Sequence, residues 1–404
     1  MKVAMVSEHA SPLAAIGGVD AGGQNVHVAQ LAGALARRGH DVTVYTRRDD
    51  PRLPGMVETA EGYMVRHLRC GPPTEVPKDE LLPHMMEFAT ELAADWSVRQ
   101  PDVAHAHFWM SGTASVSAGA ATGVPVVQTY HALGTVKKRH QGRMDTSPPE
   151  RIAIERRVGR SVARIIATCS DEVRELARMA VPRQRVTVVP CGVDVAQFTP
   201  GPAQRCPGGP QRLLVVGRLV ERKGVDDVIR AMPRLPGVEL VVAGGPPAEG
   251  LPVDPEALRL ERTAEEAGVQ DRVRLLGQVS RTEMPALMRS ADVVVTVPWY
   301  EPFGIVPLEA MACGRPVVAS AVGGLTDTVV DGVTGLLVPP RDPRRLASVL
   351  RDLLASPRLR TRLARAGLGR ARAHYTWQQV AARTEAVYEE VRHEAADRVL
   401  RAPA

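Results

Sequence analysis

Short apolar runs alternate with segments of helical periodicity along most of this 404-residue chain. Each run has the length of one strand, and each intervening segment is long enough to carry the chain back to the same edge of a sheet. This alternation is typical of parallel sheets covered by helices on both faces, so the sequence predicts an α/β fold. We expect strands at 3–6, 41–46, 103–106, 124–129, 165–168, 212–216, 239–243, 273–276, 293–297, 316–319 and 335–338.

The chain is too long for one ordinary core and suits two domains. The segment 200–210, P-G-P-A-Q-R-C-P-G-G-P, has the composition of a linker. We therefore expect two doubly wound Rossmann-like domains, at 1–200 and 201–376, facing each other across a cleft. The remaining segment, 377–404, is expected to be a helix that packs on either domain, with return to the N-terminal domain as one option. Its apolar stripe is Val380, Thr384, Val387 and Val391.

The chain carries a formal net charge of +6, and nearly all of its cations are arginine. A bias toward arginine codons explains this, and the alternative is a basic surface for an anionic substrate or for peripheral contact with a membrane. The arginines are spread along the chain without an aromatic platform, since aromatic residues make up only 3%. We therefore expect no nucleic-acid partner.

The five cysteines are scattered, and none has metal-ligand or C-x-x-C spacing, which is typical of buried thiols in a reducing compartment. No apolar run approaches the ~18–20 residues of a membrane span. The first apolar run is too short for a signal peptide. We expect a cytoplasmic protein without a transmembrane segment, and the sequence carries no signal of its oligomeric state.

Two glycine-containing loops between a strand and a helix suit a bound phosphate. In 17–24, G-G-V-D-A-G-G-Q, glycines let backbone N–H groups approach an anion, although a plain turn is an alternative. The spacing differs from G-x-G-x-x-G, which disfavours a dinucleotide. In 217–224, G-R-L-V-E-R-K-G, Arg218 follows a strand and Lys223 is expected to start the next helix. These cations suit a diphosphate, and solvated surface charge is the alternative.

The segment 298–309, P-W-Y-E-P-F-G-I-V-P-L-E, is the most informative one. Pro307 is typical of a first helical turn, which would place Glu309 in that turn and Glu301 in the loop before it. The helix end beyond Gly304 would offer free N–H groups to a phosphate. We expect Glu309 to accept hydrogen bonds from a ribose and Glu301 from sugar hydroxyls, with helix capping as the alternative for Glu309.

His131 follows the strand expected at 124–129 and is a candidate for substrate contact, although a lone histidine is more often structural. The turn 321–324, A-V-G-G, either shapes a sugar pocket or is purely structural. No D-x-D occurs, so no carboxylate pair is offered to Mg²⁺ or Mn²⁺. We expect no metal and no other cofactor. Arg218, Lys223 and helix dipoles would then stabilise a leaving diphosphate.

These motifs resemble those of the retaining glycosyltransferases of family 4, which have the GT-B architecture. The resemblance covers almost the whole chain and includes G-G-Q at 22–24, G-R-L-x-x-x-K-G, V-P-C-G-V-D ending at Asp194, and E-x7-E from Glu301 to Glu309. Within the family the chain is most similar to sucrose-phosphate synthases and the mycothiol glycosyltransferase, through A-H-A-H at 104–107 and the His131 segment.

The resemblance implies transfer of a hexosyl group from a nucleoside-diphosphate sugar, with UDP-glucose or UDP-N-acetylglucosamine favoured and GDP-mannose possible. It implies that Arg218 and Lys223 bind the diphosphate, Glu309 the ribose and Glu301 the sugar hydroxyls. His131 would contact the donor hexose near its 6-hydroxyl. The implied donor site also contains Gly22, Gly23, Gly217, Phe303, Gly304, Ile305 and Val306.

On the acceptor side, Lys78 and Arg151 match two residues that hold inositol phosphate in the mycothiol enzyme. Phe108 and Ala132 stand where that enzyme has Tyr and Thr, so two phosphate hydrogen bonds worth together ~2–4 kcal/mol would be missing. This disfavours inositol phosphate. A different phosphorylated sugar or cyclitol stays open as the acceptor, because Lys78, Lys137 and Lys138 are retained cations. The alternatives to a transferase are a disaccharide phosphorylase of the same architecture and a non-catalytic protein that binds sugar nucleotides.

Overall fold

The computed structural model describes residues 1–14, 22–202 and 208–401, with side chains described through residue 397. These residues form two compact units. One contains the chain up to Pro190 together with the segment from Trp377 onward, and the other runs from Cys191 to Thr376. The sequence placed the boundary at residue 200 instead. The difference arises because Val193 and Phe198 are buried in the core of the second unit.

The first unit is built on an eight-stranded sheet of order β3-β4-β2-β1-β5-β6-β7-β8, in which only β3 and β4 pair antiparallel. The chain runs outward from β1 through β2 to the edge strand β3, turns back into β4, and then returns to β5 beside β1. The strands are β1 (Lys2–Val6), β2 (Asp41–Arg47), β3 (Met56–Glu58), β4 (Met64–Leu68), β5 (Val103–His107), β6 (Val126–Thr129), β7 (Arg164–Ala167) and β8 (Val186–Val188).

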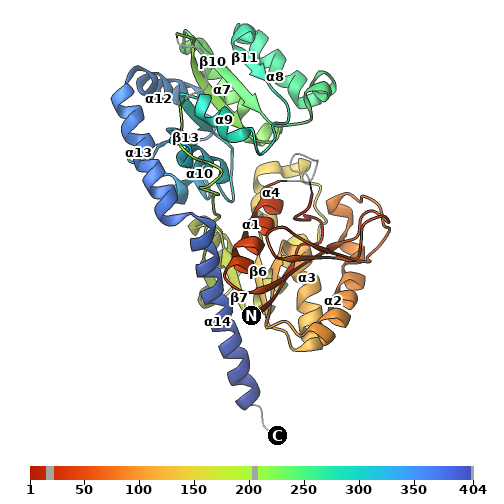
Figure 1. Ribbon diagram of the computed structural model, residues 1–404. Helices are drawn as coiled ribbons and strands as arrows, with labels where there is room; N and C mark the ends of the chain where they lie inside the picture. Colours follow the sequence, from red (N-terminus) through yellow and green to blue (C-terminus); the bar gives the residue numbers. More distant parts are fainter. Residues whose placement is uncertain (15–21, 203–207, 402–404) are drawn as a thin grey trace. The chain divides into compact units, whose positions relative to one another are not determined.

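Helices cover both faces of this sheet (Figure 1). They are α1 (Gly23–Arg37), α2 (Met85–Arg99), α3 (Trp109–Thr122), α4 (Gly134–Gln141), α5 (Arg151–Ser161) and α6 (Ser170–Arg178), with 3₁₀ turns η1 (Lys78–Glu80), η2 (Leu82–His84), η3 (Gly142–Met144) and η4 (Arg183–Arg185). The sequence missed β3, β4 and β8. Two of these have three residues each, and Arg66 and His67 interrupt the apolar pattern of β4.

The second unit has a six-stranded, fully parallel sheet of order β11-β10-β9-β12-β13-β14. Its strands are β9 (Gln211–Val216), β10 (Val238–Ala243), β11 (Val273–Leu275), β12 (Val293–Thr296), β13 (Val317–Ser320) and β14 (Leu336–Val338). Its helices are α7 (Val225–Ala231), α8 (Pro255–Glu266), α9 (Met284–Ser290), α10 (Ile305–Ala312), α11 (Leu325–Thr328), α12 (Pro343–Ala355) and α13 (Pro357–His374), with 3₁₀ turns η5 (Glu221–Lys223), η6 (Met232–Arg234), η7 (Ala248–Val253) and η8 (Gln270–Arg272). The predicted pair of doubly wound sheets is thus confirmed.

Each sheet has one point at which the winding reverses, between β1 and β5 in the first and between β9 and β12 in the second. Loops leaving neighbouring strands there diverge to opposite faces, and ligands of open parallel sheets bind in the crevice left between them. Both points adjoin loops that the sequence singled out.

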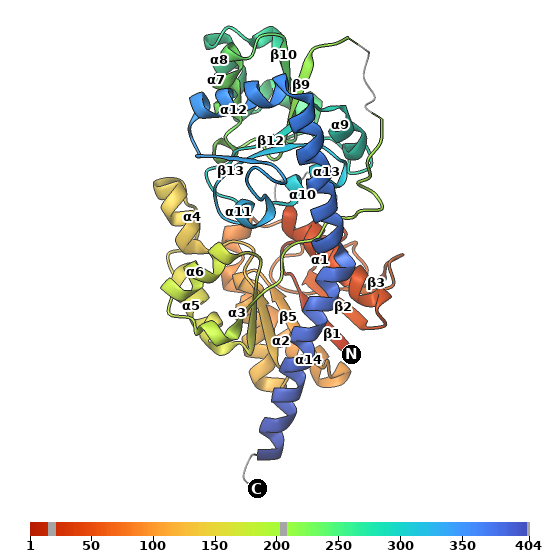
Figure 2. The same ribbon diagram turned by 90° about the vertical axis from the view of Figure 1, so that its left-hand side faces the viewer.

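The C-terminal helix α14 (Trp377–Arg401) packs on the first unit beside α1, as both views show (Figures 1 and 2). Its apolar stripe lies in the same core as Leu31 and Leu35 of α1. All four stripe residues are buried, namely Val380, Thr384, Val387 and Val391.

Val387→Asp should lower the free energy of unfolding of the first unit by roughly 3 kcal/mol or more, because it places an unpaired carboxylate in that core. Ala386, one position earlier, is exposed. Ala386→Asp is therefore the matched control and should cost less than about 0.5 kcal/mol. Urea denaturation of both variants checks this. Equal losses would show that α14 does not bury its stripe.

Candidate active site

The loops after β9 and β12 bring together residues that are far apart in the sequence. Because β9 and β12 pair directly, the two loops start from neighbouring strands. The Trp299 N–H donates to the Arg222 carbonyl at 2.9 Å, and the Arg222 guanidinium lies over the Tyr300 ring, 5.1 Å from its centroid. The first loop carries Gly217, Arg218 and Lys223, and the second carries Glu301, Phe303 and Gly304.

Lys223 and Glu301 form an ion pair across these loops, with Nζ 2.5 Å from Oε2. Both side chains are mostly shielded from solvent, at 19% and 14% exposure. Burial lowers the pKa of Lys223, whereas Glu301 raises it. Burial opposes ionisation of Glu301 too, but the charges of Lys223 and Arg222 hold its pKa below the ordinary value. Lys223 and Glu301, which the sequence predicted to bind the same sugar nucleotide, therefore neutralise each other's charge in the protein alone.

Lys223 does not start a helix, as the sequence had suggested. It ends the 3₁₀ turn η5, and α7 begins only after Gly224, which has φ +67°. A Cβ on Gly224 would stand 2.2 Å from the Val297 carbonyl oxygen. The left-handed turn and the close approach to the end of β12 both require glycine here. This glycine therefore fixes the turn that carries Lys223.

The glycines of the 321–324 turn allow it to lie against the backbone of Glu301. Gly324 N–H donates to the Glu301 carbonyl at 2.8 Å. At Gly323, with φ +48°, a Cβ would stand 2.2 Å from the same oxygen. Gly304, with φ +79°, precedes α10, so Ile305 and Val306 supply the first N–H groups of that helix.

The prediction that Glu309 lies in the first turn of its helix is wrong. The helix α10 begins at Ile305, so Pro307 is in the first turn and Glu309 is in the second. Glu309 is buried, and Arg281 Nη1 lies 2.6 Å from its Oε1. Burial raises the pKa of Glu309, against the attraction of Arg281. A capping role is therefore ruled out.

Sequence reasoning missed Arg281. Its guanidinium lies over the Phe198 ring at 4.9 Å, and its carbonyl accepts a hydrogen bond from the Gln197 side chain at 2.8 Å. The polar segment S-R-T-E at 280–283 has the composition of an ordinary surface turn, so no local pattern indicates that Arg281 pairs with Glu309. The pairing of Arg281 with Glu309 could be seen only once the chain was folded.

In the first unit, Phe108 and His131 follow the adjacent strands β5 and β6, and both have left-handed backbones with φ +82° and +62°. Such conformations cost of order 1–3 kcal/mol for residues other than glycine and gather at functional sites. The Phe108 N–H donates to the Thr129 carbonyl at 2.8 Å, which ties the two strand ends together.

His131 belongs to a cluster of histidines. Its Nε2 lies 2.9 Å from Nδ1 of His107, and the ring of His27 meets it edge-on at 5.1 Å between centroids. The His105 ring lies 4.2 Å from that of His107. Burial lowers the pKa of His27 to about 4 and of His105 to about 3, and it holds the pKa of His107 and His131 well below 6.5. All four rings are therefore neutral near pH 7.

Arg151, predicted to bind an acceptor, is buried and hydrogen-bonded to other parts of the first unit. It contacts Glu155 at 2.8 Å, the Ser147 hydroxyl at 3.1 Å and the Ala132 carbonyl at 2.7 Å. Its guanidinium also lies 5.1 Å from the centre of the Phe108 ring. The structure thus places Arg151 beside Phe108. The guanidinium N–H groups of Arg151 already donate hydrogen bonds to other groups of the protein.

Two carboxylates that the sequence did not single out, Asp79 and Asp145, link lysines of the first unit. Lys137 pairs with Asp145 at 3.0 Å and with Asp79 at 3.5 Å. Although burial opposes ionisation of Asp79, the Thr146 hydroxyl and the charges of Lys137 and Lys78 hold its pKa below the ordinary value. Half-buried Lys78 therefore lies in one charged network with Lys137, while Lys138 is exposed.

Glu8 is a further candidate at the end of β1. It is buried, Ser111 donates to its Oε2, and His9 Nδ1 lies 2.7 Å from its Oε1. The His9 ring meets Phe108 edge-on at 4.9 Å. The run S-E-H directly after an apolar strand was the signal that could have identified it. Gly22 caps α1 and Gly23 is its first residue, whereas 17–21 lie outside the described residues.

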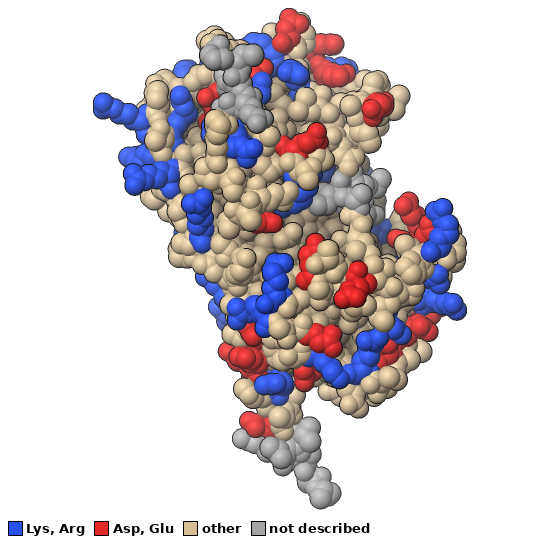
Figure 3. Space-filling model, viewed as in Figure 1, with Lys and Arg blue, Asp and Glu red and all other residues tan. Residues whose placement is uncertain are grey.

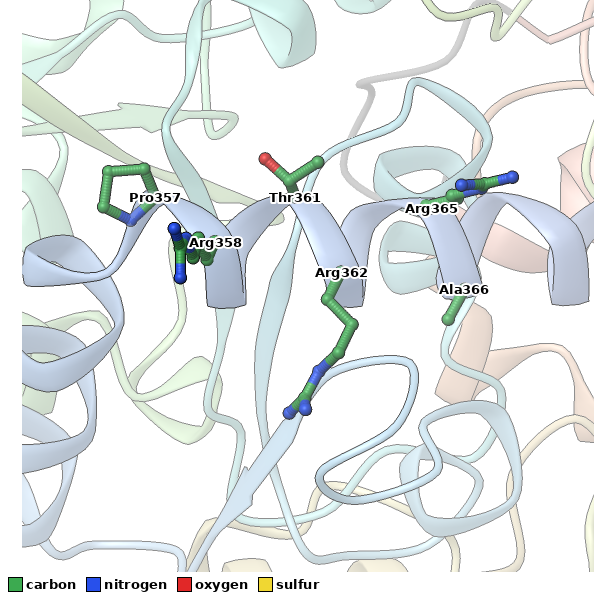
Figure 4. A pocket seen from close by; sticks show the side chains of 6 residues that line it. All are labelled: Pro357, Arg358, Thr361, Arg362, Arg365 and Ala366. Atoms are coloured by element: carbon green, nitrogen blue, oxygen red, sulfur yellow. The ribbon is translucent and has the colours of Figure 1, made fainter.

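Charged side chains also lie on the surface away from these loops (Figure 3). On the face shown in Figure 3, Lys and Arg gather at the upper left, where α12 and α13 lie in Figure 1, and are elsewhere mixed with Asp and Glu. A hollow of about 820 Å³ along α13, lined by Arg358, Arg362 and Arg365, contains none of the predicted residues (Figure 4).

Within the described ranges there is no cluster of metal-ligating side chains and no helix long and apolar enough to cross a membrane.

The family models for Glycosyltransferase Family 4 and for Glycosyl transferases group 1 match residues 21–197 and 202–370. The chain is 38% identical to D-inositol 3-phosphate glycosyltransferase 1 of Catenulispora acidiphila, over 96% of this chain and 95% of that one. The chain is a family 4 glycosyltransferase. As the sequence predicted, it is an enzyme of the GT-B architecture.

Solved structures agree with this assignment of the glycosyltransferase. Sucrose-phosphate synthase of Thermosynechococcus elongatus superimposes with a TM-score of 0.89 at 32% identity, covering 97% of this chain and 99% of that one. HepE of Anabaena, in complex with UDP-glucose, superimposes with a TM-score of 0.73 at 19% identity, covering 96% and 100%. The second likeness concerns the fold alone.

Arg281→Leu should destabilise the second unit of the glycosyltransferase by about 3 kcal/mol at pH 7, because it leaves the buried Glu309 carboxylate unpaired. The folded-state pKa of Glu309 would then lie further above that of the unfolded chain. Stability is lost as the pH rises through such a raised pKa, so the deficit should shrink between pH 7 and pH 5.

Adding Glu309→Gln to Arg281→Leu is the control, and it should restore most of the lost stability and remove the pH dependence. Urea denaturation at both pH values measures both effects. A loss of unfolding free energy that is the same at both pH values and in the double variant would contradict the electrostatic explanation.

Proposed function

We propose that this glycosyltransferase moves a hexosyl group from a UDP-sugar to a small phosphorylated sugar or cyclitol, with retention of anomeric configuration and without a divalent metal. UDP-glucose or UDP-N-acetylglucosamine is the favoured donor, with GDP-mannose as the alternative. The observation that carries the proposal is the mostly shielded Lys223–Glu301 ion pair at the reversal point of the second sheet, where the charge of Arg218 acts on Lys223 and α10 begins nearby.

The donor groups have the chemistry that a leaving nucleoside diphosphate needs. Negative charge grows on the diphosphate as the glycosidic bond breaks, so a cation acts mainly on the transition state. Lys223 supplies a compact ammonium, Arg218 a planar fork of donors, and the N-terminus of α10 a partial positive charge. Glu301 would then accept hydrogen bonds from the transferred sugar, and Glu309 from the ribose. The complex of HepE with UDP-glucose supports a uridine donor for this fold.

The acceptor assignment rests on the first unit. The relatives named D-inositol 3-phosphate glycosyltransferases support a phosphorylated cyclitol or sugar as the acceptor class. Phe108 has no hydroxyl to offer a phosphate, and the Arg151 donors already bind Glu155, Ser147 and Ala132. Lys78 and the exposed Lys138 are the cations we assign to the acceptor phosphate. These features favour an acceptor other than inositol phosphate.

Metal independence is supported by the chemistry of the residues. Without a D-x-D pair, the positive charge on the diphosphate comes from Arg218, Lys223 and α10. The four cysteines that the structure describes, Cys70, Cys169, Cys191 and Cys313, are buried free thiols, which supports a reducing, cytoplasmic compartment.

The direct test combines a donor panel with a chelator. UDP-glucose, UDP-N-acetylglucosamine and GDP-mannose are compared by thermal shift, where a ligand at about 100 times its Kd adds about 2.7 kcal/mol of stability. Transfer from the stabilising donor is then assayed with phosphorylated sugars, cyclitols and inositol phosphate as acceptors. We expect a UDP-sugar to act and EDTA to leave the rate unchanged. Loss of activity in EDTA and recovery with Mg²⁺ would overturn the metal-independent mechanism.

Arg218→Ala should lower kcat/KM by roughly 10²–10³, the usual loss when one transition-state stabiliser is removed. Arg234→Ala, which removes an exposed arginine beyond the far end of α7, is the charge-matched control and should keep the original rate. Steady-state kinetics with saturating acceptor measures both. Near-normal turnover of Arg218→Ala would remove this residue from the mechanism.

A further inference from the structure

The net positive charge of the chain is concentrated in one stretch. Residues 343–374, which contain α12 and α13, hold nine arginines and a single acidic residue, Asp352, and so carry a formal charge of +8. The whole chain carries +6, so the rest of it is slightly acidic. A general bias toward arginine codons would enrich every segment and does not produce this imbalance. The stretch therefore needs a physical explanation of its own.

The fold turns most of these arginines outward. One side of α13, formed by Leu363, Gly367 and Ala371, is buried. With 3.6 residues per turn, positions 358, 362, 365 and 372 fall on the opposite side of the helix. Figure 3 shows basic side chains gathered where α12 and α13 lie in Figure 1. The arginine surface consists of the seven exposed arginines of the stretch, namely Arg344, Arg345, Arg351, Arg358, Arg362, Arg365 and Arg372.

No carboxylate neutralises this surface. Among the residues that the structure describes, none of the seven arginines forms an ion pair or a hydrogen bond. Elsewhere in the second unit exposed charge is compensated, since Arg259 pairs with Glu256 at 2.7 Å and Arg230 with Asp226 at 2.6 Å. Ordinary protein surfaces intersperse both signs in this way. A face of uncompensated like charges repels itself and attracts an anionic partner.

The form of the surface indicates an extended partner. The open hollow of about 820 Å³ along α13 lies among these side chains (Figure 4). In Figure 4 the side chains of Arg358, Arg362 and Arg365 are spread along the helix and do not converge on one point. A site for one small anion would bring its donors together. Separate cations along several helical turns suit an array of separate negative charges instead.

We propose that the arginine surface binds the headgroups of an anionic lipid bilayer and so holds the enzyme at a membrane surface. Clusters of about four to eight Lys or Arg side chains on an amphipathic helix are typical of such binding, because the negative surface potential attracts each cation. Residues 343–374 contain no Trp, Tyr or Phe. Aromatic residues usually anchor protein partners and stack on single-stranded nucleic acids, so their absence here favours the bilayer.

Vesicles of phosphatidylcholine alone, and of phosphatidylcholine mixed with an equal amount of phosphatidylglycerol, test the arginine surface. The fraction of the protein that sediments with each kind of vesicle gives a partition coefficient. Because none of the seven arginines belongs to the residues assigned to the sugar donor or acceptor, the measurement needs no substrate. Its outcome is therefore independent of the proposed function.

Two triple variants separate the arginine surface from net charge alone. The α13 variant combines Arg358→Gln, Arg362→Gln and Arg365→Gln. The control variant removes the same amount of charge from exposed positions on α5 and α8. Urea denaturation should show the same midpoint for both variants, since only exposed side chains change. The control substitutions are Arg156→Gln, Arg157→Gln and Arg262→Gln.

We expect the original protein to bind the vesicles that contain phosphatidylglycerol and not those of phosphatidylcholine alone. Binding should weaken as salt is added, because at 0.1 M salt exposed charges are screened beyond about 10 Å. The α13 variant should lose roughly 10-fold or more in partition coefficient, and the control variant should keep most of it. Equal partition into both kinds of vesicle, or equal loss in the two variants, would overturn the proposal. Tighter binding to duplex DNA than to the anionic vesicles at the same salt would overturn it as well.

Discussion

The direct pairing of β9 with β12 is the constraint on which the proposed donor site depends. These strands are neighbours in the sheet but not in the chain, so the loops that leave them start side by side and diverge. Lys223 and Glu301 meet there although long segments separate them in sequence. Gly224 and Gly323 let those backbones approach closely, since a side chain at either position would collide with a carbonyl oxygen. The site is thus a consequence of strand order and of two glycines.

Burial of charge gives this site its properties. Lys223, Glu301 and Glu309 are each held in surroundings that oppose ionisation, and each has a partner of opposite charge within hydrogen-bond reach. Charges that are already desolvated and held in place need little reorganisation when negative charge develops on a leaving group. The histidine cluster of the first unit differs, because burial keeps its rings neutral.

The sequence predicted the two sheets because a parallel strand buried on both faces is a continuous apolar run, which no polar position obscures. It missed β4, whose Arg66 and His67 break that run. It correctly placed Arg218 and Glu301, which we propose to bind the donor, on loops. It assigned Glu309 to the wrong helical turn, because Pro307 can occupy any position in a first turn. Arg281 and the partners of Arg151 depend on contacts between distant segments. No local pattern contains that information.

The most direct test of the donor site is a crystal structure of the enzyme with UDP bound. We predict that Lys223 Nζ and the Arg218 guanidinium lie within about 3 Å of diphosphate oxygens, with the phosphates at the first turn of α10 and the ribose hydroxyls on Glu309. No divalent ion should bridge the phosphates. A nucleotide bound away from Lys223 and Arg218, or a metal ion between the diphosphate and protein carboxylates, would contradict this mechanism.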